Sequence, residues 1–292
     1  MNQTAVVGVV GLGLVGTAVA RRLLGAGRRV LGYDIAGEAS RKARDFGVQT
    51  VDRLSDLPGK TGLFILSLPA ADAVDAVLWG SDGIGERCGP GSIILDTTTT
   101  RAEDTVRHNQ RIAKRGVRFA DVTLVGSSAE IAEGRAVALV GDTAEAANAY
   151  ADPIKTFATH LFFLGGPGKG NQAKLLVNLV LGLNRLVLAE ALAFAEKTDI
   201  KPGQLLEILK ASAAYSRVMD SKGEKMLTGN FEPVARLAQH AKDVGLILEL
   251  AKQVGGNTPL SELHARMLQE AIKHGWGELD NSAIIRAFQL NA

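Results

Sequence analysis

Apolar and polar residues along the first half of the chain predict strands and helices in alternation. Short apolar runs rich in Val, Ile and Leu are typical of buried strands, and segments with helical apolar spacing separate them. Strands are expected at residues 5–10, 30–33, 62–68, 92–96, 118–122, 136–140 and 161–164, and helices at 17–24, 40–45, 71–78, 102–115 and 143–157. Strands that alternate with helices of this length build βαβ units and a mainly parallel sheet.

The second half of the chain has a different pattern, in which helical spacing predominates and no convincing strand is present. Helices are expected at residues 171–198, 202–212, 216–228, 233–254, 259–274 and 280–288. The glycine-rich segment Gly165–Gly170 separates the two patterns. The predicted fold is therefore α/β, with a doubly wound parallel sheet over residues 1–164, followed by an all-α domain over residues 165–292.

A glycine fingerprint follows the first predicted strand and opens the first predicted helix. It reads Gly11-Leu12-Gly13-Leu14-Val15-Gly16, and the second strand ends at Asp34. In such a turn the first glycine permits the bend, the second lets backbone approach a pyrophosphate, and the third lets helix and strand pack closely. Glycine turns with a purely structural role are the alternative, but the full order of strand, fingerprint, helix, strand and acid predicts a Rossmann-type dinucleotide site.

The acid at the end of the second strand indicates which nicotinamide dinucleotide is bound. The carboxylate of Asp34 suits the two hydroxyls of an adenosine ribose. A ribose phosphate at about 4 Å would be repelled by roughly 4 kcal/mol at an effective dielectric of 20. If solvent exposure reduces this repulsion to about 1.4 kcal/mol, NADP would still bind tenfold more weakly. We therefore expect NAD rather than NADP, and Arg41 is interpreted as a surface residue of a helix.

Composition narrows the functional class. The 292 residues are 46% hydrophobic and 22% charged, with a formal net charge of +2, so neither a nucleic acid nor a membrane surface is expected as a partner. The single cysteine, Cys88, excludes an intramolecular disulfide and suggests a reducing, cytoplasmic location. The first residues lack the basic region of a signal peptide. The histidines have no metal-ligand spacing, so no metal is expected.

The longest apolar stretch, Leu175–Ala195, is interpreted as a buried helix and not as a membrane span. It contains four polar residues that would be costly in lipid, namely Asn178, Asn184, Arg185 and Glu190.

Lys174 and Asn178 are the residues with the clearest chemical potential. They are four apart in a predicted helix and therefore share one face, among Leu and Val residues. Such a lysine can extend its amine to solvent, which is the structural alternative. Reduction of a carbonyl, however, needs a proton donor, and burial lowers the pKa of lysine toward the working range. Lys174 is therefore the candidate acid/base group, Asn178 could hold the substrate oxygen, and Lys169 is the rival lysine.

Several motifs together resemble the β-hydroxyacid dehydrogenases, which include 3-hydroxyisobutyrate dehydrogenase and tartronate semialdehyde reductase. They are GLGLVG at Gly11, SLP at Ser67–Pro69, DTTTT at Asp96–Thr100, DVTLVGSSAEIAEG at Asp121–Gly134, GPGKGNQAKLLVN around Lys174, and HAKD at His240–Asp243. The resemblance implies that Lys174 is the acid/base group and that Asn178 supports substrate binding. It also implies that Leu68, Pro69, Thr98 and Thr99 line the cofactor, and that Lys242 and Asp243 reach the cleft, Lys242 near both cofactor and substrate.

The loop after Asp121 departs from the family pattern Asp-Ala-Pro-Val-Ser-Gly-Gly. Here the sequence carries Thr123 for proline, Val125 for serine and Ser127 for the second glycine. In the family this loop offers backbone N–H groups and the serine hydroxyl to the substrate carboxylate. Thr123, Val125, Gly126 and Ser127 are accordingly predicted to line the substrate, with the hydroxyl of Ser127 or Ser128 in place of the missing one. Val177 and Ala102 are further departures.

These features predict an NAD-dependent oxidoreductase that interconverts a small β-hydroxyacid with its semialdehyde or keto form. Two alternatives remain open: an NADP-dependent enzyme like the imine reductases, and a non-catalytic cofactor-binding protein. The relatives that resemble this chain form dimers and tetramers, so a homodimer or homotetramer is expected, with the helix Leu175–Ala195 at the interface.

Overall fold

The computed structural model describes residues 6–289 and divides the chain into two compact units. Unit 1 ends at Lys174 and unit 2 begins at Leu175. The domain boundary expected between Leu164 and Gly165 lies before this division and stays a prediction. Ala5, which the sequence pattern assigns to the first strand, lies outside the described residues.

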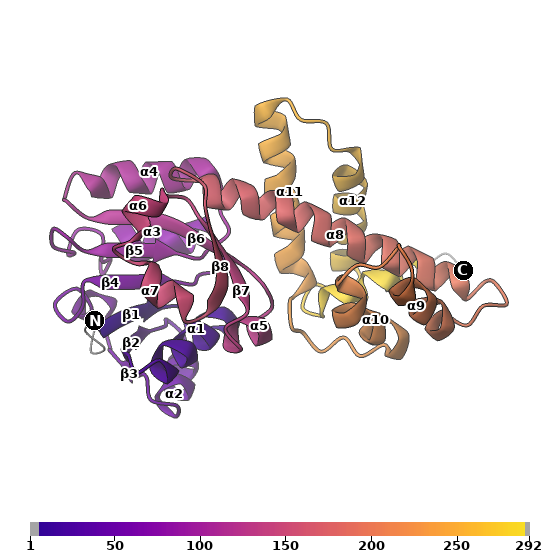
Figure 1. Ribbon diagram of the computed structural model, residues 1–292, viewed down its shortest axis with the longest axis horizontal. Helices are drawn as coiled ribbons and strands as arrows, with labels where there is room; N and C mark the ends of the chain where they lie inside the picture. The colour runs from indigo at the N-terminus through magenta and orange to yellow at the C-terminus, as the bar shows by residue number, and fades with distance from the viewer. Residues whose placement is uncertain (1–5, 290–292) are drawn as a thin grey trace. The chain divides into compact units, whose positions relative to one another are not determined.

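Unit 1 is built on one eight-stranded sheet (Figure 1). Its strands are β1 (Val6–Val10), β2 (Arg29–Tyr33), β3 (Gln49–Thr50), β4 (Leu63–Leu66), β5 (Ile93–Asp96), β6 (Arg118–Val125), β7 (Ala136–Val140) and β8 (Ala158–Phe163). They lie in the order β3-β2-β1-β4-β5-β6-β7-β8, and every neighbouring pair is parallel except β6 with β7. The expected doubly wound, mainly parallel sheet is therefore confirmed.

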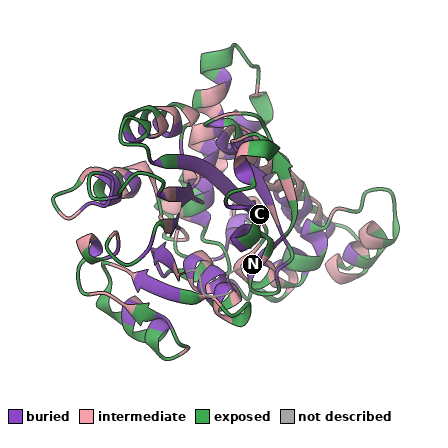
Figure 2. Ribbon diagram, turned by 60° about the vertical axis from the view of Figure 1, so that its left-hand side comes forward, coloured by how far each residue is buried: buried purple, intermediate pink, exposed green. Residues whose placement is uncertain are grey.

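Helices cover both faces of this sheet because alternate strand residues point to opposite sides. The helices of unit 1 are α1 (Leu14–Gly25), α2 (Gly37–Arg44), α3 (Ala71–Trp79), α4 (Ala102–Ala113), α5 (Ser128–Ala132), α6 (Ala144–Ala147) and α7 (Ala151–Lys155). Val9 and Ile65 pack with α1, α2, α5 and α7 on one face, whereas Phe64 and Leu66 pack with α3 and α4 on the other. Figure 2 shows the central strands coloured as buried, whereas the edge strands β3 and β8 are largely exposed or intermediate.

One local prediction in unit 1 was wrong, and two short elements were not predicted. The single helix expected over 143–157 is two short ones, α6 and α7, because Pro153 lacks an N–H and could not continue the helical hydrogen bonds. Helix α5 and the two-residue strand β3 were not expected, since each is too short to show a period.

Unit 2 is helical, as expected. Helix α8 (Lys169–Ala195) begins in unit 1 and continues into unit 2, followed by α9 (Pro202–Ala211), α10 (Val218–Thr228), α11 (Leu237–Val254), α12 (Pro259–Lys273), a 3₁₀ segment at Asn281–Ile285 and α13 (Arg286–Gln289). The core includes Leu188, Leu192 and Val244. By length and composition alone α8 could cross a membrane, but Asn178 and Arg185 are buried in the protein, as in a core helix.

The fully buried carboxylate of Asp280 joins three segments of unit 2. Its oxygens accept hydrogen bonds from Lys222 Nζ at 2.8 and 2.9 Å, from Ser282 Oγ at 2.8 Å and from the backbone N–H of Val234 at 3.0 Å. Burial alone would raise the pKa of Asp280, but Lys222 and Ser282 outweigh it and lower that pKa to about 2. Burial also lowers the pKa of Lys222.

Substitution Lys222→Met is expected to destabilise the protein by about 3–5 kcal/mol at neutral pH, because it leaves a buried carboxylate without its cation. The pKa of Asp280 is lower in the folded than in the unfolded chain, so its stabilising effect is present above pH 4 and disappears as the pH falls toward 2. The difference in the free energy of unfolding between wild type and variant should therefore narrow as the pH falls from 5 to 3. Urea unfolding at the two pH values measures it.

Lys252→Met is the matched control, since Lys252 is exposed on α11. This control should change the free energy of unfolding by less than about 0.5 kcal/mol. A Lys222→Met protein as stable as the control at neutral pH would show that the buried pair does not hold unit 2 together.

Candidate functional site

The glycine fingerprint forms a close turn at the carboxyl end of β1, next to β4, where the strand order reverses. Gly11 has a φ of +89°, and a Cβ there would lie 2.2 Å from the carbonyl oxygen of Ser67. A Cβ at Gly16 would lie 1.9 Å from the carbonyl oxygen of Gly11. Neither position can accept a side chain, so both glycines are required by the turn itself.

The residues between these glycines leave room for a ligand at the start of α1. A Cβ at Gly13 would meet nothing within 4 Å, and Leu14 is exposed. Gly13 is the N-cap of α1, no side chain caps the helix, and its first turn contains no acidic residue. The first N–H groups of α1 can therefore hold a pyrophosphate, and the residues present fit a dinucleotide.

Asp34 lies beside this turn. Its Oδ2 accepts a hydrogen bond from the backbone N–H of Leu12 at 2.6 Å, and its Oδ1 accepts one from Ala36 at 2.8 Å. The contact with Leu12 links the acid directly to the fingerprint, although Leu12 and Asp34 are far apart in the sequence. A carboxylate at this place would bind the ribose hydroxyls of NAD and repel a ribose phosphate.

The loops that follow β4 and β5 are joined to each other. The Oγ1 of Thr98 accepts a hydrogen bond from the backbone N–H of Leu68 at 3.2 Å. The backbone N–H of Thr98 in turn donates to Asp96 Oδ1 at 2.9 Å. Thr98 is buried, whereas Thr99 is half-buried. The carboxyl ends of parallel strands line the ligand side of such a sheet, so these loops and the fingerprint face the same region.

A buried carboxylate on β6 holds the start of α8. Asp121 accepts hydrogen bonds from the backbone N–H groups of Gly168 at 3.0 Å and Asn171 at 2.9 Å, and burial raises its pKa despite these bonds. Thr123 Oγ1 donates to the carbonyl oxygen of Gly170 at 3.0 Å. Thr123 is fully buried and has this structural contact, so its assignment to substrate binding stays a prediction.

Asn171 is a site residue that the sequence interpretation missed. It is fully buried, its Oδ1 accepts from the N–H of Thr100 at 2.8 Å, and its Nδ2 donates to Thr105 Oγ1 at 3.1 Å. It therefore links α8 to the loop after β5 that contains Thr98 and Thr99. Nothing in the local sequence distinguishes it from an ordinary polar residue in the first turn of a helix.

Lys174 is half-buried, and its Nζ donates a hydrogen bond to the carbonyl oxygen of Leu124 on β6 at 2.6 Å. Its amine is therefore directed at the strand that leads into the predicted substrate loop. The rival lysine, Lys169, is exposed and donates to Gln172 at 3.2 Å.

Three further predicted site residues lie together in unit 2. Asn178 Nδ2 donates to Asp243 Oδ2 at 2.9 Å, and Lys242 Nζ is 3.4 Å from Asp243 Oδ1. Asn178 and Asp243 are buried. This group offers an amide, a carboxylate and an ammonium within a few ångströms, which is a suitable set of partners for a small polar substrate.

The predicted substrate loop contains a capping box that the sequence interpretation also missed. Ser127 N donates to Glu130 Oε2 at 2.8 Å, and Glu130 N donates to Ser127 Oγ at 3.2 Å, which begins α5. The Ser-x-x-Glu spacing is a known signal for this arrangement and could have been read from the sequence. Val125 is half-buried and Gly126 is exposed.

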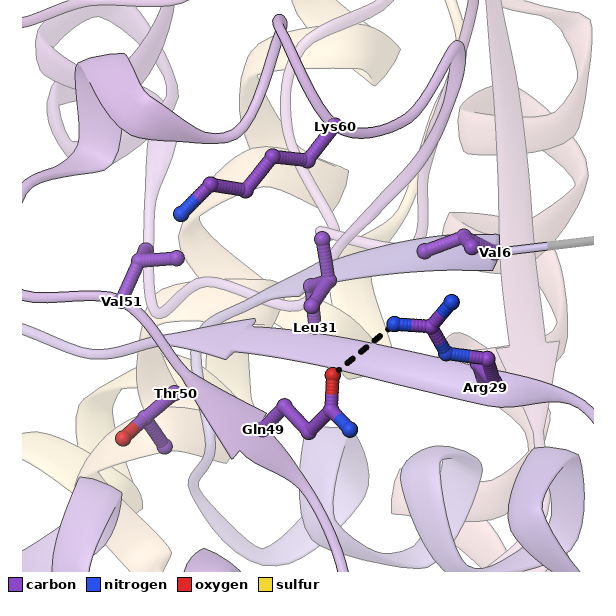
Figure 3. A pocket seen from close by; sticks show the side chains of 7 residues that line it. All are labelled: Val6, Arg29, Leu31, Gln49, Thr50, Val51 and Lys60. Atoms are coloured by element: carbon purple, nitrogen blue, oxygen red, sulfur yellow. Dashed lines mark hydrogen bonds between the residues drawn. The ribbon is translucent and has the colours of Figure 1, made fainter.

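Two other features lie away from this chemistry. A pocket of about 350 Å³ is lined by residues of β1, β2 and β3, such as Val6, Arg29 and Gln49, and by Lys60, and Asp34 is not among its lining residues (Figure 3). Cys88 is a buried free thiol whose pKa is raised to about 11 by burial, so it is a poor nucleophile. Within residues 6–289 no group of three His, Cys, Asp or Glu residues is placed to hold a metal ion.

Comparison with known families covers nearly all of the described chain. A family model described as the NAD binding domain of 6-phosphogluconate dehydrogenase matches residues 6–165. A second, described as the NAD-binding region of NADP-dependent 3-hydroxyisobutyrate dehydrogenase, matches residues 168–288. The chain belongs to the β-hydroxyacid dehydrogenase family. It is an oxidoreductase that acts on CH–OH groups with NAD as cofactor, and the family prediction from the sequence is confirmed.

Characterised relatives match this family member over almost their full length. The chain is 26% identical over 290 residues to 2-(hydroxymethyl)glutarate dehydrogenase of Eubacterium barkeri, covering 99% of this chain and 96% of that protein. It is 27% identical over 283 residues to L-threonate dehydrogenase of Cupriavidus necator, covering 97% and 95%. The crystal structure of 3-hydroxyisobutyrate dehydrogenase from Salmonella typhimurium has a TM-score of 0.89 at 23% identity, covering 97% and 99%, and shows the same fold.

Substitution Asp34→Asn is expected to lower the preference for NAD over NADP by about tenfold or more. The neutral amide removes the charge that repels a ribose phosphate, and it keeps only one acceptor for the N–H groups of Leu12 and Ala36. Dissociation constants of NAD and NADP, measured by calorimetry, give the ratio.

Asp45→Asn is the control, because Asp45 is an exposed acid at the end of α2. Its NAD to NADP ratio should equal that of the wild type. An Asp34→Asn protein with an unchanged ratio would show that cofactor choice depends on other residues.

Proposed function

We propose that this enzyme interconverts a small β-hydroxyacid with its semialdehyde or keto form, with Lys174 as the acid/base group. The named activities of two relatives, on L-threonate and on 2-(hydroxymethyl)glutarate, support a substrate that carries both a hydroxyl and a carboxylate. Bound NAD accepts or supplies the hydride. The chain itself must then bind the acid, orient the reacting carbon and move one proton.

The hydrogen bond from Lys174 to Leu124 is the observation that carries this proposal. A backbone carbonyl cannot take a proton from an ammonium, so this contact orients the amine without neutralising it. When an alcohol is oxidised, the neutral amine would take the hydroxyl proton, and when a carbonyl is reduced, the ammonium would return it. The 2.6 Å contact holds Nζ at the end of β6, where the predicted substrate loop begins.

Asn178 supports this role from one helical turn further along α8. Its amide is oriented by Asp243, and we propose that it holds a substrate oxygen. Lys242 adds a positive charge near Asp243 that suits an acidic substrate. Thr98, Thr99, Leu68 and Pro69 are proposed to line the nicotinamide.

Substitution Lys174→Ala is expected to lower kcat about 10²–10⁴-fold while NAD binding is retained, because the proton transfer loses its positioned group. Lys174→Arg keeps the charge but does not release a proton near neutral pH, so it should lose a similar factor. Steady-state rates with NAD and a panel of small hydroxyacids, together with NAD dissociation constants, test both variants.

Lys169→Ala is the matched control and should retain wild-type rates, since Lys169 is exposed and its amine donates to the side chain of Gln172. A folded Lys174→Ala enzyme that binds NAD and keeps wild-type turnover would contradict the proposal. Turnover of amines or imines alone would favour the imine reductase alternative instead.

We further propose that the protein is a cytoplasmic homodimer or homotetramer. Four apolar side chains follow one face of α8 and are more than half exposed, namely Leu176, Val180, Val187 and Phe194. Their spacings of four and seven residues keep them in one stripe, and a stripe of this kind is typical of a subunit interface.

Substitution Val187→Glu is expected to convert the oligomer to monomers, because it places a charge in the centre of the apolar stripe. Size-exclusion chromatography with light scattering measures the mass. Ile35→Glu, an equally drastic change at an exposed position outside α8, should leave the mass unchanged. A wild-type monomer, or an oligomer that tolerates Val187→Glu, would contradict this assignment of the interface.

A further inference from the structure

The side chain and the backbone N–H of Asn171 join α8 to three other segments of unit 1. The N–H donates to Asp121 Oδ2 on β6 at 2.9 Å, and Oδ1 accepts from the backbone N–H of Thr100, in the loop after β5, at 2.8 Å. Nδ2 donates to Thr105 Oγ1 on α4 at 3.1 Å. Asn171 is fully buried, so the loss of any of these bonds would leave a buried polar group unsatisfied.

The start of α8 also lies very close to its neighbours in unit 1. A Cβ at Gly168 would lie 2.8 Å from the carbonyl oxygen of Ala102, the first residue of α4. A Cβ at Gly170 would lie 2.6 Å from the carbonyl oxygen of Leu139 on β7. Backbone contacts this close leave the first turn of α8 little room to shift.

The loop after β5 is held at its two ends by different parts of unit 1. Near β5 the backbone N–H of Thr98 donates to Asp96 Oδ1 at 2.9 Å, which holds this end of the loop to the sheet. Near α4 the backbone N–H of Thr100 donates to Asn171. The second end is therefore held by the helix that carries Lys174.

Asn171 thus lies between the two groups that the proposed reaction brings to one substrate. Lys174 is three residues further along α8 and lies on the same side of the helix. Thr98 and Thr99, which are proposed to line the nicotinamide, directly precede Thr100. One hydrogen bond and one helical turn therefore connect the cofactor loop to the lysine.

The amide of Asn171 is not needed to begin the helix. Asp121 already holds the start of α8 through the backbone N–H groups of Gly168 and Asn171, and these bonds require no particular side chain at position 171. The side-chain amide offers an acceptor to Thr100 and a donor to Thr105 at the same time, which neither a carboxylate nor an alkyl group can do. Its additional effect is to join α8 to the cofactor loop and to α4.

We propose that Asn171 is a positioning residue that fixes the distance between the nicotinamide loop and Lys174. Hydride transfer and proton transfer act on the same C–OH group, and a misplacement of about 1 Å can cost about 10²-fold in rate. Because Asn171 is fully buried, it acts through Thr100 and through α8. The proposal rests on the proposed function, and it implies that loss of the amide slows the chemical step more than it weakens binding.

The test compares Asn171→Ala with Thr105→Val, its matched control. Both variants lose a buried hydrogen bond, so a purely structural effect should lower the thermal stability of both. Only Asn171→Ala frees the N–H of Thr100. With the panel hydroxyacid that the wild type oxidises fastest, kcat per NAD-binding site should fall about 10–100-fold in Asn171→Ala and less than about threefold in Thr105→Val. Calorimetric titration with NAD counts the sites, so misfolded protein does not enter the rate.

Two further measurements separate positioning from a loss of structure. The KM for the hydroxyacid and the dissociation constant of NAD should change by less than about threefold in Asn171→Ala, because the binding groups remain. Deuterium isotope effects on kcat are measured with substrate deuterated at the reacting carbon and, separately, in D₂O. A fall of both effects toward one would show that a step other than the chemistry was slowed, and would overturn the proposal.

The variants also distinguish this proposal from the proposed function. Wild-type turnover per NAD-binding site in Asn171→Ala, or an equal loss in Thr105→Val, overturns the role of Asn171 while an impaired Lys174→Ala still supports the acid/base role. Wild-type turnover in a folded Lys174→Ala enzyme overturns the proposed function itself, whatever Asn171→Ala does.

Discussion

The buried carboxylate of Asp121 fixes the start of the helix that carries Lys174, the proposed acid/base group. Its oxygens accept hydrogen bonds from the backbone N–H groups of Gly168 and Asn171, which would otherwise be unsatisfied donors at the start of α8. The fit is close, since a Cβ at Gly141 would lie 2.0 Å from Asp121 Oδ1. This junction fixes the first turns of α8 against β6 and so brings Lys174 onto Leu124. A lysine on an unanchored helix start would have no defined position and would be a poor proton carrier.

The sheet and the cofactor turn could be predicted from the sequence because their signals are local. Apolar runs identify the strands, and the fingerprint needs glycine at Gly11 and Gly16 for reasons that a short segment contains. The contacts of Asp121 and Asn171 could not be predicted in this way. They join residues 50 and 66 positions apart, and each looks like an ordinary polar residue in its own segment. Position in the fold, and not residue type, gives them their function.

The capping box shows the opposite case, in which a local signal was present but a family resemblance directed attention elsewhere. Ser127 was interpreted as a donor to substrate because its neighbours match a substrate loop. In this structure its N–H and hydroxyl donate to Glu130, three residues later, in a capping box that the Ser-x-x-Glu spacing predicts, and its role toward substrate stays a prediction. Side chains and backbone groups near a helix start compete for the same donors, and the local partner has the smaller entropic cost.

The difference between donors and acceptors decides what each acid of unit 1 can still do. A carboxylate oxygen has two lone pairs, so Asp34 can keep the N–H of Leu12 and still accept a ribose hydroxyl. The N–H of Ser127 has one hydrogen and, once bound by Glu130, has none left for a substrate acid. The same type of contact, a carboxylate on a backbone N–H, therefore leaves an acceptor available at Asp34, whereas at Ser127 it uses the single N–H hydrogen to begin α5.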